Sequence, residues 1–425
     1  MEPEPGSHPP SERLELLYHL SQTFNSSLDL EKVLNKVMDE VIPAVGAERG
    51  FVVLRAEENR RLDFRAARGI DQNTIVDPQF QISRGVVESV IENGEAVLTS
   101  DAQSDERFSA RMSVVNLRLR SILCAPLKIK SSILGAIYVD NSLRVGIFTE
   151  DDLDLLCAIA ASAAVAIENA RLYQVAVEKG RMERELQLAY KVQASLIPPR
   201  APSCPGWDFA ARWIPAREVA GDFYDYFLLG EGELGVVIGD VADKGMASAL
   251  FMANCRSVIR ASMLSARSLQ NGMRHANRLI CADSTEGIFL TLFYARLDLN
   301  NGELAYINAG HNPPLLMRDQ GSGLNSLKRT GVALGVDENA RFEVGQEHID
   351  SGDLLCLYTD GVTEAMDGNN QQFGVERLEK LLSDSQGQKT DSILEELERK
   401  LEAFTGSGLP FDDITLLVVK REGMR

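Results

Sequence analysis

Aspartates stand at the ends of short apolar runs at four places in this sequence. The runs are LGVVIGD with Asp240, LLCLYTDG with Asp360, Asp222 before FYDYFLL, and Asp412-Asp413 before ITLLVV. Short apolar runs bounded by glycine or polar residues indicate buried strands, so each carboxylate falls at a strand end. Carboxylates gathered at one sheet edge raise one another's pKa, and oxygen ligands of this kind favour Mg²⁺ or Mn²⁺ over zinc. The alternative is four unrelated turn aspartates.

The chemistry that such a cluster predicts is hydrolysis of a phosphate ester. Two divalent ions roughly 3.5–4 Å apart can lower the pKa of a water and hold a phosphoryl group for in-line attack. Convergence of the four strand ends is the condition for this chemistry.

Length and composition limit the class of protein. A chain of 425 residues with 44% hydrophobic and 25% charged residues is globular, with two or three domains. Its net charge of −18 argues against nucleic acid or an anionic membrane as partner. The six cysteines form no C-x-x-C pair, and the start MEPEPGSHPPSER is no signal peptide. The apolar stretch 155–167 is too short to span a bilayer, so we expect a cytoplasmic protein.

The predicted elements divide the chain into four parts of an α+β protein. An N-terminal extension at 1–24, disordered and then helical, precedes a domain of helices and an antiparallel sheet at 25–172. A linker helix at 173–199 leads to a second α+β domain at 200–420. Within that domain Asn301-Gly302 favours a tight hairpin turn.

The linker helix belongs to a longer predicted helix that begins after Thr149 as N-cap and ends at Leu196. Its apolar residues follow a heptad-like spacing, but a step of five between Val177 and Met182 breaks the phase near Gly180. One interpretation is a helix that changes its packing partner. The other, which we favour, is a coiled coil that forms a homodimer and transmits a signal through a joint at Gly180.

Five motifs occur in order along the C-terminal half: AGDFYD, GDVADKG, NAGHNPP, YTDGVTEA and FDDITLLVV. Together they resemble the metal-dependent Ser/Thr phosphatases of the protein phosphatase 2C (PPM) superfamily, in the bacterial SpoIIE/RsbU branch. The segment ELQLAYKVQASLIPP resembles the helix that precedes the catalytic domain in that branch. The resemblance covers 185–420 and implies an αββα sandwich with two Mn²⁺ or Mg²⁺. The metal ligands that it implies are Asp222, Asp240, the Val241 carbonyl, Asp360 and Asp412, with Asp413 competing for the last place.

The same resemblance suggests further roles. Arg217 would hold the substrate phosphate, for which its planar guanidinium is suited, although an exposed Arg is common. His311 would lie near the active site, or serve only the loop that contains it. Asp225 would orient metal-bound water, and loop stability explains Lys244 as well as any catalytic role does. No His follows Asp240, so the general acid of some eukaryotic relatives is missing and water would protonate the leaving group.

The N-terminal domain resembles a GAF sensor module. The resemblance rests on SILCAPLKIKSSILGAIYVDN and FTEDDLDLLCAIAASAAVAIENARLY. It implies a possible small-molecule ligand, but a cyclic-nucleotide motif would need a Lys after Asn141. Cys124 and Cys157 lie in apolar stretches typical of a core, not of chromophore attachment. The sequence therefore assigns no ligand.

The two resemblances imply a GAF-regulated protein serine/threonine phosphatase in a bacterial cytoplasm. Its substrate would be a phosphorylated STAS-type anti-anti-sigma protein in a partner-switching pathway. The alternative is a non-catalytic pseudophosphatase that acts as a dimeric signalling adaptor. Aspartates at all four strand ends argue against that alternative.

Overall fold

A computed structural model describes most of the chain, in the ranges 10–56, 61–69, 82–100, 121–142, 145–284, 287–319, 323–406 and 410–423. Residues 1–9 of the expected N-terminal extension lie outside these ranges. Contacts divide the chain into two compact units, Met1–Met182 and Glu183–Arg425. Each unit is described by itself.

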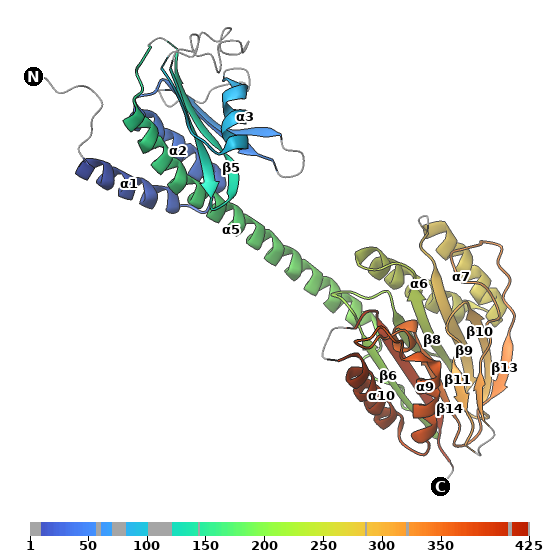
Figure 1. The fold of residues 1–425 in the computed structure, drawn as a ribbon. Coiled ribbons are helices and arrows are strands. Elements are labelled where there is room, and N and C mark those ends of the chain that lie inside the picture. The colour runs from blue at the N-terminus through green and yellow to red at the C-terminus, as the bar shows by residue number, and fades with distance from the viewer. Residues whose placement is uncertain are drawn as a thin grey trace, which may run out of the picture. The chain divides into compact units, whose positions relative to one another are not determined.

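The N-terminal unit is built on one antiparallel five-stranded sheet with the strand order β2-β1-β5-β4-β3 (Figure 1). Its strands are β1 (Arg49–Arg55), β2 (Leu62–Gly69), β3 (Val97–Thr99), β4 (Ser121–Ile129) and β5 (Ser132–Asn141). Its first helices are α1 (Pro10–Asn25), α2 (Leu30–Val45) and α3 (Arg84–Asn93). Side chains of α1, α2 and α5 form a core with one face of the sheet, and α3 forms a second core with the other face. The antiparallel sheet expected for this domain is therefore present.

The long helix α5 spans Glu150–Leu196, as predicted. Thr149 and Asp152 exchange hydrogen bonds that cap its first turn. The helix continues through Gly180, so the expected joint is not a break in the helix. By length and composition α5 could cross a membrane, with a window of mean hydropathy 1.6, but half of that window is buried in the protein. One such helix is weak evidence for a membrane span.

The C-terminal unit is a sandwich of two antiparallel five-stranded sheets, β13-β10-β9-β8-β7 and β12-β11-β14-β15-β6. The strands of the first are β7 (Phe223–Gly230), β8 (Glu233–Val241), β9 (Leu290–Asp298), β10 (Glu303–Ala309) and β13 (Gly345–His348). Those of the second are β6 (Trp207–Ile214), β11 (Leu315–Met317), β12 (Leu324–Ser326), β14 (Leu354–Tyr358) and β15 (Ile414–Arg421).

Helices cover both outer faces of this sandwich (Figure 1). The helices are α6 (Met246–Ser265) and α7 (Leu269–Asp283) on the first sheet, and α9 (Gly374–Asp384) and α10 (Thr390–Thr405) on the second. A single short turn, α8 (Asp360–Thr363), follows β14. The architecture is the αββα sandwich that the resemblance implied.

Burial of both faces explains why the strands read as continuous apolar runs. In β15, Leu417 and Val419 belong to the core between the sheets, whereas Leu416 and Val418 pack toward α9 and α10. Successive side chains of a strand point to opposite faces, so a strand covered on both faces is apolar throughout. The predicted hairpin at Asn301-Gly302 joins β9 to β10, with Gly302 at a φ of 89°.

Candidate functional site

The four strand ends meet where the two sheets pack together. Asp240 is the penultimate residue of β8, opposite Thr291 of β9, and Asp222 immediately precedes the neighbouring β7. Asp360 follows β14, and Asp412 lies just before β15, its neighbour in the second sheet. Each sheet therefore contributes carboxylates from two adjacent strands.

The pKa values report how close these carboxylates lie. Burial and then the charge of Asp360 raise the pKa of Asp240 to about 7, although a hydrogen bond with Asp222 acts in the opposite direction. Burial also raises the pKa of Asp222 well above its usual range, helped by the charges of Asp240 and Asp413. Burial and then the charge of Asp412 raise the pKa of Asp360. Carboxylates of both sheets thus repel one another at one place.

Two threonines of the second sheet hold Asp222. The hydroxyls of Thr359 and Thr415 donate to Oδ2 of Asp222 over 2.6 and 2.9 Å. All three side chains are buried, so the hydrogen bonds join the two sheets within the cluster.

The geometry distinguishes Asp412 from Asp413. Both carboxylate oxygens of Asp413 accept backbone N–H groups, from Ala216 over 2.8 Å and from Gly221 over 2.7 Å. Oδ2 of Asp412 instead forms an ion pair of 2.7 Å with Nζ of Lys244. Asp413 therefore fixes the loop before β7, and Asp412 is the carboxylate that faces a cation.

The cluster as it stands is not arranged around a metal ion. Among the described residues, no three His, Cys, Asp or Glu side chains are placed to hold one. Thr359 and Thr415 both donate hydrogen bonds to Oδ2 of Asp222, and Lys244 forms an ion pair with Asp412. The donors are nevertheless all oxygens with repelling charges, which suits Mg²⁺ or Mn²⁺ once Lys244 has left Asp412.

Comparisons with known proteins agree with this architecture. Residues 230–422 match the family described as Stage II sporulation protein E (SpoIIE), and residues 29–167 match the GAF domain family. The C-terminal part of the chain is therefore similar to the SpoIIE family, and the N-terminal part is similar to the GAF domain family. The SpoIIE match includes Asp240, Asp360 and Asp412, and it begins after Asp222.

Relatives and solved structures extend the comparison. Protein IcfG of Synechocystis sp. is 34% identical over 58% of this chain and 43% of its own length. Phosphoserine phosphatase RsbU of Bacillus subtilis is 26% identical over 57% of this chain and 71% of its own length. The SiaA-PP2C domain of Pseudomonas aeruginosa, 21% identical over 58% of this chain and 98% of that domain, has a TM-score of 0.52 and shares the fold. The chain spans less than half of IcfG.

Arg217 of the C-terminal unit is exposed beside the cluster. It lines a small hollow together with Lys244, Asp412 and Asp413. A guanidinium in this position is placed to meet a phosphate that approaches the aspartates.

His311 is not placed to contact a substrate. Its side chain is buried, and burial lowers its pKa to about 3, so the imidazole is neutral. Nδ1 lies 2.8 Å from the hydroxyl of Thr291, the residue opposite Asp240. His311 therefore lies near the cluster, where its ring interacts with Thr291 of β9 and with the backbone of Tyr358 in β14.

Asp225 also differs from the expectation. Its carboxylate forms ion pairs of 2.9 Å with Arg256 and with Arg260, both on α6. The side chain is buried against that helix. It ties α6 to β7 instead of orienting water at the cluster.

Gln193, near the end of α5, is a residue whose role the sequence did not reveal. Its carboxamide donates to the carbonyl of Ala220 over 2.6 Å and accepts from the N–H of the same residue over 2.9 Å. Gln193 is buried, and Ala220 lies two residues before Asp222. In the sequence, Gln193 occupies a heptad position that otherwise carries apolar residues, which could have indicated a buried polar contact. For Thr359 and Thr415, the position of a hydroxyl close to a motif aspartate could have indicated a hydrogen bond to the cluster.

Proposed function

We propose that this chain is a metal-dependent protein phosphatase that hydrolyses phosphoserine or phosphothreonine. The observation that carries the proposal is the cluster of mutually repelling carboxylates at the meeting of the two sheets. Asp222, Asp240, Asp360 and Asp412, with the Val241 carbonyl, would hold two Mn²⁺ or Mg²⁺. When bound, these ions supply an activated water and neutralise charge on the phosphoryl group.

The remaining roles belong to side chains around the cluster. Thr359 and Thr415 keep the Asp222 carboxylate oriented, and Asp413 holds the loop that carries Arg217. Arg217 would bind the non-bridging oxygens of the phosphate through its planar guanidinium. With no His after Asp240, solvent would return the proton to the departing serine oxygen.

Phosphate release by the full chain tests this function. We expect hydrolysis of p-nitrophenyl phosphate and of a phosphoserine protein with Mn²⁺ or Mg²⁺, and none with excess chelator, because the ions would lower the pKa of the attacking water and neutralise charge on the phosphoryl group. Metal-independent turnover, or no turnover of either substrate with any divalent ion, would contradict the proposal.

The substrate that we propose is a phosphorylated STAS-type anti-anti-sigma protein in a partner-switching pathway, in the bacterial cytoplasm. The support is the resemblance to the SpoIIE/RsbU branch and the similarity to phosphoserine phosphatase RsbU. The negative charge of the chain supports the absence of nucleic-acid partners.

We further propose that α5 joins two copies and transmits signals from the GAF domain, whose ligand would be a small molecule. Exposed apolar side chains along the helix support a homodimer; they include Leu172, Tyr173, Val177, Met182 and Leu188. The two hydrogen bonds between Gln193 and Ala220, here called the Gln193 clamp, would transmit movement of the helix to Asp222. Gly180 would be the position at which the helix is least stable.

Gln193→Ala in the full chain should raise the Mn²⁺ concentration needed for half-maximal activity by about tenfold. Two buried hydrogen bonds to Ala220 are lost, a cost of about 1–3 kcal/mol that loosens the segment before Asp222. Gln187→Ala changes an exposed residue of the same helix and should leave the metal dependence unchanged. Equal half-saturation values for the two variants would rule out the clamp as the connection.

A non-catalytic adaptor is the second candidate function. The Lys244–Asp412 ion pair favours it, because an ammonium group already neutralises one of the proposed ligands. Bound Mn²⁺ without turnover of either substrate would support this candidate.

A further inference from the structure

An apolar groove lies next to the carboxylate cluster in the C-terminal unit. Its volume is about 300 Å³, and it is bounded by the segment around α8, by α10 and by the start of β15. Ala365, Leu401 and Ile414 provide apolar lining. Neither the metal ligands nor Arg217 line it, so it is separate from the proposed catalytic site.

Chain connectivity places the groove beside two of the proposed ligands. Gly361, which lines the groove, directly follows Asp360, and Phe411, which also lines it, directly precedes Asp412. Consecutive Cα atoms are 3.8 Å apart, so the groove begins within one residue of each aspartate. Nζ of Lys244, paired with Asp412, also lies 4.7 Å from the centre of the Phe411 ring.

The groove exposes apolar side chains to solvent. Phe411 is 71% exposed and Met366 is 37% exposed. Apolar surface gathered beside a functional site is typical of a binding surface, because burying it upon binding is favourable.

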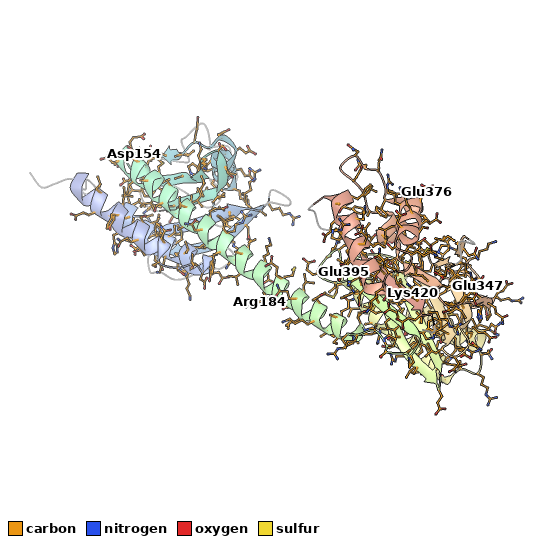
Figure 2. The ribbon with its side chains drawn as sticks, turned by 90° about the horizontal axis from the view of Figure 1, so that it is seen from below. Asp154, Arg184, Glu347, Glu376, Glu395 and Lys420 are labelled. Carbon is orange, nitrogen blue, oxygen red and sulfur yellow. The ribbon has the colours of Figure 1, made fainter. Side chains whose placement is uncertain are left out.

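One side of the groove carries acidic residues. Glu395, Glu398 and Glu402 are spaced three and four residues apart, so they share a face of α10. Glu398 forms an ion pair of 2.8 Å with Arg212, whereas Glu402 has no ion-pair partner among the described residues. Glu395, labelled in Figure 2, is exposed on the same helix. Glu398 and Glu402 line the groove.

We propose that this groove binds the segment of the protein substrate next to the phosphorylated residue, with an apolar side chain in the groove and a Lys or Arg against Glu402. This inference rests on the proposed phosphatase function. A phosphoserine held at the aspartates places its neighbours over the groove, because an extended chain advances about 3.3 Å per residue. The apolar lining and the unpaired Glu402 then select the two side-chain types.

The experiment uses the full chain with Mn²⁺ and three kinds of substrate. One is p-nitrophenyl phosphate, which is too small to reach the groove. The others are phosphoserine peptides with Leu and Arg about two to four residues from the phosphoserine on either side, and the same peptides with Ala at both positions. The variants are Met366→Ala, Phe411→Ala and Glu402→Lys. The matched control is Val375→Ala, a similarly exposed apolar residue on α9.

We expect the unaltered protein to prefer the Leu and Arg peptides by about tenfold in kcat/KM. Met366→Ala and Phe411→Ala should remove most of the preference for Leu, and Glu402→Lys should remove that for Arg. Val375→Ala should change neither, and p-nitrophenyl phosphate should be hydrolysed within about twofold of the unaltered rate by every variant.

Two results would overturn the docking proposal while leaving the phosphatase function intact. One is equal hydrolysis of both peptide kinds by the unaltered protein. The other is an equal loss on p-nitrophenyl phosphate and on the peptides, which would mean that the substitutions disturb the cluster itself. Absence of hydrolysis of any substrate by the unaltered protein would instead refute the proposed function, and the inference with it.

Discussion

Asp240→Asn should lower kcat/KM for p-nitrophenyl phosphate and for phosphoserine protein by at least about 10²–10³-fold. Asp240 lies at the centre of the cluster: it forms a hydrogen bond with Asp222, and its pKa is raised by burial and then by the charges of Asp360, Asp412 and Asp413. Asn keeps the shape of the side chain and removes the charge that would hold a cation. Steady-state rates at saturating Mn²⁺ measure the effect.

Asp243→Asn is the matched control for this substitution. Asp243 is exposed and three residues from Asp240, so the change removes one nearby charge without altering the cluster, and activity should stay within about twofold. A similar loss in both variants would show that general electrostatics, not ligation, explains the effect.

The thermal stability of the metal-free proteins provides a second readout, in which Asp240→Asn should not show a loss. Because the folded-state pKa of Asp240 is raised to about 7, its contribution to stability is present at low pH and is lost as the pH rises through about 7. Asn does not titrate, so Asp240→Asn should be at least as stable as the unaltered protein above pH 7 in chelator. Thermal unfolding across this pH range therefore separates lost ligation from misfolding.

Gly361→Ala should lower activity by about 10²-fold and also reduce thermal stability. A Cβ at position 361 would lie 2.1 Å from the carbonyl oxygen of Asp413 and 3.2 Å from that of Asp412. The backbone that carries Asp412 must then move away from Asp360. A shift of about 1 Å in such a site can cost about 10²-fold in rate. Steady-state kinetics and the Mn²⁺ concentration for half-maximal activity measure the outcome.

Gly368→Ala is the control for the added methyl group. Gly368 follows the same helical turn, is exposed, and a Cβ there would meet no atom within 4 Å. Its activity and melting temperature should match those of the unaltered protein. Unchanged activity in Gly361→Ala would mean that the close contact between these two segments does not position the aspartates.

Local sequence predicted the elements of the site better than it predicted their contacts. The runs before Asp240 and Asp360 indicated strands, and the structure contains both. Their convergence depends on the pairing of β8 with β9 and of β14 with β15, which joins residues far apart in the chain. Spacing alone contains no information on such contacts.

Side-chain direction was the other property that the sequence could not supply. Where both faces of a strand are buried, apolar alternation does not tell which face a polar residue occupies. Asp225 in β7 therefore faces Arg256 and Arg260 of α6, and His311 lies buried beside Thr291. A single buried residue such as Gln193 likewise finds its partner only in the folded chain.

Mn²⁺ binding to the full chain, measured by isothermal titration calorimetry near pH 7.5, tests the central claim most directly. If carboxylates of both sheets form one metal centre, the unaltered protein should bind two Mn²⁺ per chain. Asp240→Asn should lose at least one of them, and Asp243→Asn should lose none. No saturable Mn²⁺ binding by the unaltered protein, or the same two ions bound by Asp240→Asn, would contradict the account.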